Sequence, residues 1–158
     1  MVPVAALLAL PSAAEGHATG HETCRDQPAA HGDNTNNQFT GDNNTDVYAG
    51  LGGADTIAGR GARDLLCGNV GSDVIDGDDG NDEMNGGEDQ DTVRGNPGSD
   101  EVHGGSHGDN IFGGDGNDLL FGEDGNDDID GGSGFDRACG GSGVNDIHPD
   151  VEDPNGLC

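Results

Sequence analysis

The sequence is poor in the residues that build ordinary hydrophobic cores and poor in positive charge. It has no tryptophan, one tyrosine and four phenylalanines, and only 30% of its 158 residues are hydrophobic. Five basic residues stand against 32 acidic ones, which gives a formal net charge of -27. Such a composition, taken alone, is typical of a disordered polymer. The negative charge makes nucleic acid and anionic membranes poor partners. We therefore expect bound divalent cations to supply the folding free energy that hydrophobic burial cannot.

Long apolar runs are also absent, apart from one at residues 1–14. This run is too short for a stable membrane anchor, and small residues at Ser12 and Ala14 suit cleavage by signal peptidase before Glu15. Its first residues carry no lysine or arginine, so a different start, a truncated segment or a disordered apolar tail remain alternatives. We expect residues 1–14 to be a signal peptide, and the protein to be secreted and extracellular.

A polar leader follows at residues 15–31, and it shows neither helical nor alternating periodicity. Its histidines His17 and His21 could share a helix face and bind a transition metal, but solvated histidines of a flexible leader are the simpler interpretation. Arg25 stands where a zinc metalloprotease helix would need its second histidine, so no such enzyme is indicated.

Glycine, in contrast, is abundant and periodic over residues 32–148, which contain thirteen nine-residue repeats. Position 1 of every repeat is glycine: Gly32, Gly41, Gly50, Gly59, Gly68, Gly77, Gly86, Gly95, Gly104, Gly113, Gly122, Gly131 and Gly140. Position 6 is aspartate in the eleven inner repeats, at Asp46, Asp55, Asp64, Asp73, Asp82, Asp91, Asp100, Asp109, Asp118, Asp127 and Asp136, with Asn37 and Asn145 at the ends. Position 8 is always apolar, from Phe39 to Ile147. Three columns with one period identify a structural repeat.

These repeats resemble the hemolysin-type (RTX) calcium-binding repeat, Gly-Gly-x-Gly-x-Asp-x-apolar-x, with the best copies at residues 113–121 and 77–82. The resemblance implies an all-β fold, a right-handed parallel β-roll with two repeats per coil. It implies that the first six residues of each repeat form a turn that binds Ca2+ and the last three a short strand. More weakly, the chain is similar to small secreted calcium-binding proteins of actinobacterial type.

The repeat also has a geometric consequence of its own. The glycine, asparagine and aspartate residues of positions 1 to 6 suit left-handed turn conformations. Alternation along positions 7 to 9 turns position 8 away from its neighbours. If two repeats make a coil, as the resemblance implies, two position-8 ladders should face each other inside the roll. Thirteen repeats then make about six and a half coils, with a length of roughly 30 Å.

The same stacking should align the position-6 aspartates along two edges, where they repel unless a cation lies between successive turns. Ca2+ suits such turns because it accepts six to eight oxygen ligands in flexible geometry, whereas Mg2+ requires a stricter octahedron. Pairs of aspartates two repeats apart give at most nine sites. The expected metal residues are the eleven position-6 aspartates together with Gly77, Gly80, Gly95, Gly98, Gly113, Gly116, Gly122, Gly125, Gly131 and Gly134.

In the eleven inner repeats, position 4 departs from glycine at Asn44, Ala62, Asp89 and His107. Asparagine tolerates the left-handed region, but the other side chains make the turn costly. We therefore expect the weakest sites at the repeats that begin at residues 59, 86 and 104. The strongest should be the pairs Asp82/Asp100, Asp100/Asp118, Asp118/Asp136 and Asp55/Asp73.

Four cysteines in an exported chain predict two disulfides. Cys67 and Cys139 lie eight repeats apart, about four coils or ~19 Å, which is beyond disulfide reach. We expect the local pairs Cys24–Cys67 and Cys139–Cys158, which would hold the leader and the tail on the roll; the crossed pairing remains an alternative. The tail at residues 149–158 breaks the period with two prolines and is predicted to cap the roll.

The two motifs that resemble catalytic or metal-binding signatures lack the sequence context that they need. We therefore expect that the protein is not an enzyme. The Gly-x-Ser-x-Gly pattern at residues 104–108 lies within a turn of the array, without the helix that a nucleophile elbow needs. Residues 124–129 lack the glycine of an EF-hand loop. Two alternatives to a secreted calcium-binding protein remain, an accessory module of a larger exoenzyme or toxin and an extracellular adhesion or matrix protein. For the latter, the outward residues Leu65, Leu119, Phe112 and Phe121 offer at most a small apolar patch.

Overall fold

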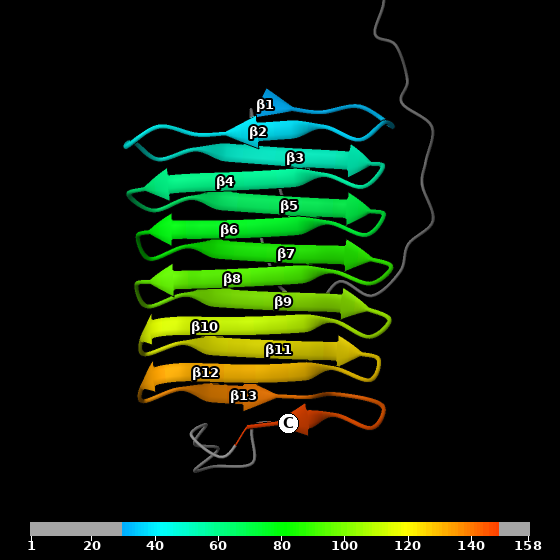
Figure 1. The fold of residues 1–158 in the computed structure, drawn as a ribbon, viewed down its shortest axis with the longest axis vertical. Helices are drawn as coiled ribbons and strands as arrows, with labels where there is room; N and C mark the ends of the chain where they lie inside the picture. The colour runs from blue at the N-terminus through cyan, green and yellow to red at the C-terminus, as the bar shows by residue number, and fades with distance from the viewer. Residues whose placement is uncertain (1–29, 149–158) are drawn as a thin grey trace, which may run out of the picture.

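The computed structural model describes residues 30–148, and all regular structure in this range is β-strand (Figure 1). None of these residues forms a helix that could cross a membrane. The predicted signal peptide at 1–14, most of the polar leader and the capping tail at 149–158 lie outside the described residues.

Fourteen strands form two parallel sheets of seven strands each. In chain order, the first sheet, here sheet A, contains β1 (Ala30–His31), β3 (Val47–Gly52), β5 (Leu65–Val70), β7 (Glu83–Glu88), β9 (Glu101–Ser106), β11 (Leu119–Asp124) and β13 (Arg137–Cys139). Sheet B contains β2 (Gln38–Thr40), β4 (Thr56–Gly61), β6 (Val74–Asp79), β8 (Thr92–Pro97), β10 (Asn110–Gly116), β12 (Asp128–Gly134) and β14 (Asp146–Ile147). The chain alternates between the sheets, so each pair of strands completes one coil.

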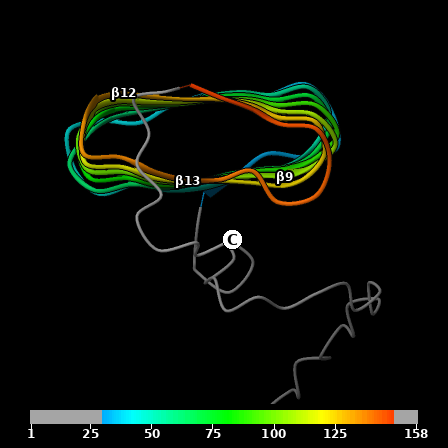
Figure 2. The same ribbon diagram turned by 90° about the horizontal axis from the view of Figure 1, so that it is seen from below.

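The register of the sheets equals two nine-residue repeats. Ile57 pairs with Ile75, and Ile75 pairs with Val93, each eighteen residues further along the chain. Viewed along the stack, the coils superpose into a flattened ring with the sheets on its two long sides and the turns at its ends (Figure 2). The predicted parallel β-roll with two repeats per coil is confirmed.

The strands are longer than the predicted three residues. A strand such as β4 runs from position 7 of one repeat through position 3 of the next, and only positions 4 to 6 form the turn. Burial alternates along the strand. The side chains of position 8, and of position 6 just before the strand, therefore point into the roll, and the glycine at position 1 faces the same way. The predicted turn was too long because glycine and asparagine at positions 1 to 3 suit turns, whereas parallel pairing with both neighbours keeps these residues extended.

The position-8 side chains form the core, as predicted. The nine from Ile57 to Ile129 are fully buried, and they belong to a single cluster in which the two ladders meet. At the first coil, Phe39 and Tyr48 stack with ring centroids 4.1 Å apart and close this end of the core. At the other end, Ile147 is 40% exposed. Each coil contributes only two apolar position-8 side chains to this core, which is too little for hydrophobic burial alone to hold the fold.

One short strand lies where the sequence predicted no regular structure. β1, at the end of the polar leader, pairs Ala30 with Tyr48 and His31 with Ala49 in the register of the roll. These residues occupy positions 8 and 9 of an incomplete repeat, and Ala30 is too small to contribute a recognisable apolar position. The described part of the roll therefore includes the two residues before Gly32.

Candidate metal-binding turns

The position-6 aspartates stack in two columns, one at each end of the flattened ring. The Asp91 edge, between sheet A strands and the sheet B strands that follow, carries Asp55, Asp73, Asp91, Asp109 and Asp127. The Asp82 edge, at the opposite turns, carries Asp46, Asp64, Asp82, Asp100, Asp118 and Asp136. All except Asp46 are at least 98% buried, so they point into the roll rather than outward from its edge.

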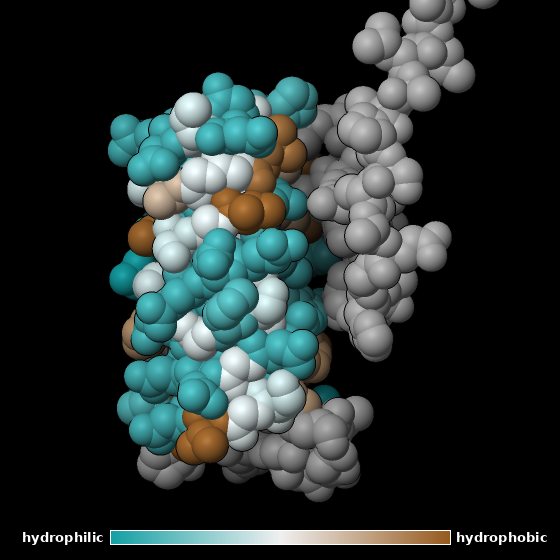
Figure 3. Space-filling model, turned by 90° about the vertical axis from the view of Figure 1, so that its right-hand side faces the viewer, coloured by the Kyte–Doolittle hydropathy of each residue, from teal (hydrophilic) through white to brown (hydrophobic). Residues whose placement is uncertain are grey.

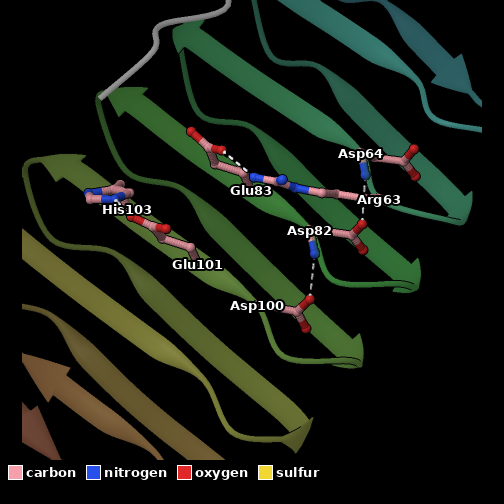
Figure 4. Close-up of polar contacts among 7 residues, drawn as sticks. All are labelled: Arg63, Asp64, Asp82, Glu83, Asp100, Glu101 and His103. Atoms are coloured by element: carbon pink, nitrogen blue, oxygen red, sulfur yellow. Dashed lines mark hydrogen bonds and ion pairs between the residues drawn. The ribbon is translucent and has the colours of Figure 1, made fainter. Parts of the chain in front are cut away.

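One carboxylate oxygen of each buried aspartate is hydrogen-bonded. The backbone N–H of each aspartate donates to Oδ1 of the aspartate eighteen residues later, at 2.7–3.0 Å, in nine successive pairs. Asp64, Asp82 and Asp100 show the arrangement, one above another on adjacent turns (Figure 4). The same bonds extend the Asp91 edge at both ends. The backbone N–H of Asn37 donates to Oδ1 of Asp55, and that of Asp127 donates to Oδ1 of Asn145. The alignment of the aspartates two repeats apart is thus as predicted.

The second oxygen, Oδ2, is buried and lacks a hydrogen-bond partner in ten of these residues: Asp55, Asp64, Asp73, Asp82, Asp91, Asp100, Asp109, Asp118, Asp127 and Asp136. A buried charged oxygen without a partner costs several kcal/mol. Ten such atoms in two regular columns are too systematic to be packing defects. Each needs a proton or a cation.

The Oδ2 atoms explain the invariant glycine at position 1. A Cβ on Gly59 would point into the roll, overlap Oδ2 of Asp64 and lie 2.8 Å from the carbonyl oxygen of Gly77 in the next coil. The other described position-1 glycines meet the equivalent atoms, apart from the terminal coils, where asparagine replaces aspartate or no next coil follows. None of the position-1 glycines has a positive φ. The predicted reason, a left-handed turn, is therefore wrong at position 1, and the reason is lack of space.

Left-handed backbone occurs instead at position 2, and at position 4 of several repeats, as predicted for Ala62 and His107. Every position-2 residue from Leu51 to Gly141 has a positive φ, including the non-glycine residues Leu51 at 79°, Arg60 at 83° and Glu123 at 71°. A left-handed conformation costs an ordinary side chain roughly 1–2 kcal/mol. Because glycine, asparagine and several larger residues alternate at this position, the sequence did not reveal it.

Burial raises the pKa of the central aspartates far above the usual value of 3.8. Desolvation is the main cause; the backbone N–H that binds Oδ1 lowers the pKa, and neighbouring carboxylates raise it. The pKa rises to about 8 at Asp91, to about 7 at Asp100 and Asp109, and to about 6 at Asp73, Asp82 and Asp118. Ionising these carboxyl groups at neutral pH is therefore costly, because nothing among the described residues compensates the charge on Oδ2.

Backbone oxygens lie beside the carboxylates at position 4. A Cβ on Gly80 would overlap the carbonyl oxygen of Ala62 in the preceding coil and lie 2.7 Å from Oδ1 of Asp82. Gly98 meets the carbonyl oxygen of Gly80 and Oδ1 of Asp100 in the same way. The predicted glycines thus have two roles: those at position 1 make room for Oδ2, and those at position 4 let a carbonyl oxygen approach from the neighbouring coil.

This set of donors fits a hard cation. Across residues 30–148, no three His, Cys, Asp or Glu side chains gather closely enough to hold a metal ion by themselves. Each turn instead offers carboxylates from adjacent coils together with backbone carbonyl oxygens. Ca2+ is commonly bound by such mixtures of carboxylate and carbonyl oxygens, whereas zinc prefers nitrogen and sulfur.

Asparagine at position 5 contributes a second ladder that the sequence analysis did not identify. Oδ1 of Asn36, Asn81, Asn117 and Asn126 accepts the backbone N–H of the position-5 residue eighteen residues later, at 2.8–3.0 Å. These bonds satisfy turn amides without any metal. The Asn-Asp pairs in the sequence were the available signal, since they place this ladder directly before the aspartate column.

The outer surface offers little else that points to a site. Hydrophilic residues cover most of the face that Figure 3 shows. Phe112 lies on sheet B under Arg94, whereas Leu65, Leu119 and Phe121 lie on sheet A, so the outward apolar residues do not form the single patch considered above. Ser106, at the end of β9, is followed by a turn and not by a helix, so the Gly-x-Ser-x-Gly pattern lacks its required context.

Cys67 and Cys139 lie on β5 and β13, four strand steps apart in sheet A, in agreement with the spacing predicted above. Their predicted partners, Cys24 and Cys158, lie outside the described residues. The two pairings remain predictions.

Comparison with known families shows to which repeat family the nine-residue repeats belong. The family model of the RTX calcium-binding nonapeptide repeat (4 copies) matches residues 40–75, 68–102 and 103–138, which together span more than half of the chain. The chain belongs to this family. Among curated proteins, a search finds no match. The RTX repeats of this chain thus form the parallel β-roll described above, and their family is defined by calcium binding.

Proposed function

We propose that this RTX protein is a secreted, non-enzymatic calcium-binding protein whose roll folds when Ca2+ enters its turns. The single observation that carries the proposal is the double column of buried Oδ2 atoms without partners. Calcium is the cation that the RTX family implies, and the oxygen-rich turns suit it.

The ligands in this proposal are the position-6 aspartates of adjacent coils and carbonyl oxygens of the turns between them. The nine stacked aspartate pairs set the upper limit at nine ions. In pairs such as Asp82/Asp100 and Asp100/Asp118, both repeats have glycine at position 4. No side chain at that position then restricts the backbone of either turn. The glycines at positions 1 and 4 act indirectly, because they make room for the oxygens.

Folding on binding follows from the electrostatics. The unfolded chain leaves its carboxylates solvated, whereas the roll buries ten of them at position 6. A cation that binds only the roll stabilises it by mass action. The narrow apolar core and the asparagine ladders then define the shape, and calcium decides whether that shape forms.

Export and the disulfides belong to the same proposal. The apolar run at residues 1–14 is the proposed signal, and an oxidising compartment would allow Cys24–Cys67 and Cys139–Cys158 to form. Neither Cys67 nor Cys139 is a free thiol, which supports the proposed disulfides. Mass spectrometry of unreduced peptides tests the pairing, and a Cys24–Cys139 peptide would favour the crossed arrangement.

A calcium titration of metal-free protein at pH 7.5 tests the function. Circular dichroism should change from a disordered to a strand spectrum as Ca2+ is added, and calorimetry should count several ions and no more than nine per chain. Mg2+ at the same concentrations should have a much smaller effect, because it gives up its waters reluctantly. A strand spectrum that is complete without divalent ions and unchanged by Ca2+ would refute the proposal.

A further inference from the structure

The outer faces of the two sheets differ in the burial of their position-9 side chains. On sheet A these residues are direct partners on neighbouring strands, so they form one column across the sheet: Ala49, Cys67, Asn85, His103, Phe121 and Cys139. Three of them, Ala49, Cys67 and His103, are only 3–6% exposed. On sheet B, no position-9 residue from Thr40 to Asp130 is buried to this degree.

Residue type does not explain this difference, because the two faces offer matched pairs. Ala49 on sheet A is 5% exposed, whereas Ala58 at the same position of sheet B is only partly buried. Phe121 on sheet A is partly buried, whereas Phe112 on sheet B is 37% exposed although Arg94 lies over its ring. All four residues lie between strands that pair on both sides. The flanking strands alone therefore do not account for the burial on sheet A.

His103 is the centre of a polar group on this column, here called the His103 cluster. Its Nδ1 lies 2.8 Å from Oε1 of Glu123 and its Nε2 lies 3.5 Å from Oε1 of Glu101 (Figure 4). Its ring stacks on Phe121 with centroids 4.6 Å apart. The histidine side chain is 4% exposed, and the two glutamates are 37% and 40% exposed. Two carboxylates stand against one imidazole, so the cluster keeps a net negative charge even when His103 is protonated and suits a further cationic donor.

Cys67 indicates which segment covers the column. It is not a free thiol, and Cys139, four strand steps away, is beyond disulfide reach. Its partner therefore lies outside residues 30–148, and the proposed partner is Cys24. The six residues from Cys24 to Ala30 span up to ~20 Å when extended, whereas β1 and β5 are two strand spacings or about 10 Å apart. The polar leader can thus reach the outer face of sheet A.

We propose that the leader, residues 15–29, lies across the outer face of sheet A, with Cys24 bonded to Cys67 and His21 against the His103 cluster. Cys67 and His103 are two strand spacings or about 10 Å apart, and the three extended residues from Cys24 back to His21 cover the same distance. The imidazole of His21 supplies the donor that the glutamates of the cluster suit. The inference rests on the proposed disulfide and goes beyond it, because a leader held only at Cys67 would leave His103 uncovered.

Reaction of the histidines with diethyl pyrocarbonate, located by mass spectrometry, tests this placement. The full-length protein is labelled with calcium present at pH 7.5, and circular dichroism checks that each variant keeps its roll. His21→Ala removes the proposed contact. His17→Ala is the matched control, because seven extended residues carry His17 ~23 Å from Cys24, past the cluster. The double variant Cys24→Ser/Cys67→Ser releases the leader from its anchor.

We expect His103 to react about tenfold faster in His21→Ala, the loss of one charge-assisted hydrogen bond, and at least as fast in the double cysteine variant. His17→Ala should leave the rate unchanged. An equal His103 rate in all four proteins would overturn the inference. Protection that persists in every variant but falls on dilution would place a second copy of the chain on this face, and it would overturn the inference as well.

Peptide mapping of the unreduced protein separates this failure from failure of the proposed disulfide. A Cys24–Cys67 peptide together with a His103 that reacts equally in every variant would refute only the placement of the leader. A Cys67–Cys158 peptide would refute the proposed pairing and, with it, the anchor of the leader. Calcium binding by the turns is unaffected in either case.

Discussion

The buried aspartates predict that protons and calcium compete for the same roll. A carboxyl group whose pKa is raised on folding favours the folded state below its unfolded pKa of about 4. That contribution is lost as the pH rises through the folded pKa, which is about 6 to 8 for the six central aspartates with a printed value. Without calcium, the roll should therefore be most stable in mild acid and least stable above pH 8.

The size of the effect decides whether the calcium-free roll folds. One pKa unit corresponds to ~1.4 kcal/mol, so at pH 7 burial costs about 4 kcal/mol for each of Asp91, Asp100 and Asp109, and about 3 kcal/mol for each of Asp73, Asp82 and Asp118. A few such costs together already match the ~5–15 kcal/mol that stabilises a typical domain. At pH 4.5 the same cost falls to about 1 kcal/mol each. The calcium-free roll is thus expected at pH 4.5 and not at pH 7.5.

Circular dichroism of dialysed, metal-free protein measures this directly. We expect a strand spectrum at pH 4.5 without calcium, a disordered spectrum at pH 7.5, and recovery of the strand spectrum at pH 7.5 with millimolar Ca2+. Calcium binding at pH 7 should also release protons, which calorimetry in buffers of different ionisation enthalpy detects. A calcium-free roll at pH 7.5, or a disordered chain at both pH values, would refute the reasoning.

Three further predictions concern single positions. Asp100→Asn should leave the roll folded with less dependence on calcium and reduce the number of bound ions, because an amide can donate where Oδ2 has no partner; Asp76→Asn, on the outer face, should change neither quantity. Gly59→Ala should destabilise the calcium-loaded roll in thermal unfolding by about 3 kcal/mol, because the added methyl meets a carboxylate and a carbonyl; an unchanged melting temperature would contradict the steric account. Leu51→Gly should stabilise it by up to about 1 kcal/mol, by removing left-handed strain; destabilisation in chemical unfolding would show that the leucine contributes more by packing.

Most of the fold could be predicted from the nine-residue period of the sequence. Because glycine, aspartate and an apolar residue recur in one nine-residue frame, the sequence predicted the coil, the facing ladders from Ile57 to Ile129 and the alignment of aspartates eighteen residues apart. These features depend on repetition, on strand alternation and on the two repeats per coil that the family resemblance implies. The short strand β1 was missed because two residues show no period.

The physical role of single positions was harder to predict than the fold. Glycine at position 1 suggested backbone freedom, yet the space around Gly59 is limited by Asp64, a contact that appears only when the coil closes. The inward direction of the aspartates follows from strand residues that the sequence assigned to the turn. Burial of their carboxylates, and with it the large pKa shift of Asp91, depends on stacking on both sides and leaves no local signal.

A crystal structure grown from calcium-containing buffer at neutral pH tests the central claim most directly. The account predicts metal density between successive coils, within bonding distance of the stacked position-6 aspartates and turn carbonyl oxygens on both edges. The same roll with no metal in its turns, and with each Oδ2 within hydrogen-bond distance of the position-1 carbonyl of the next coil, would show that protons alone satisfy the columns and would contradict the account.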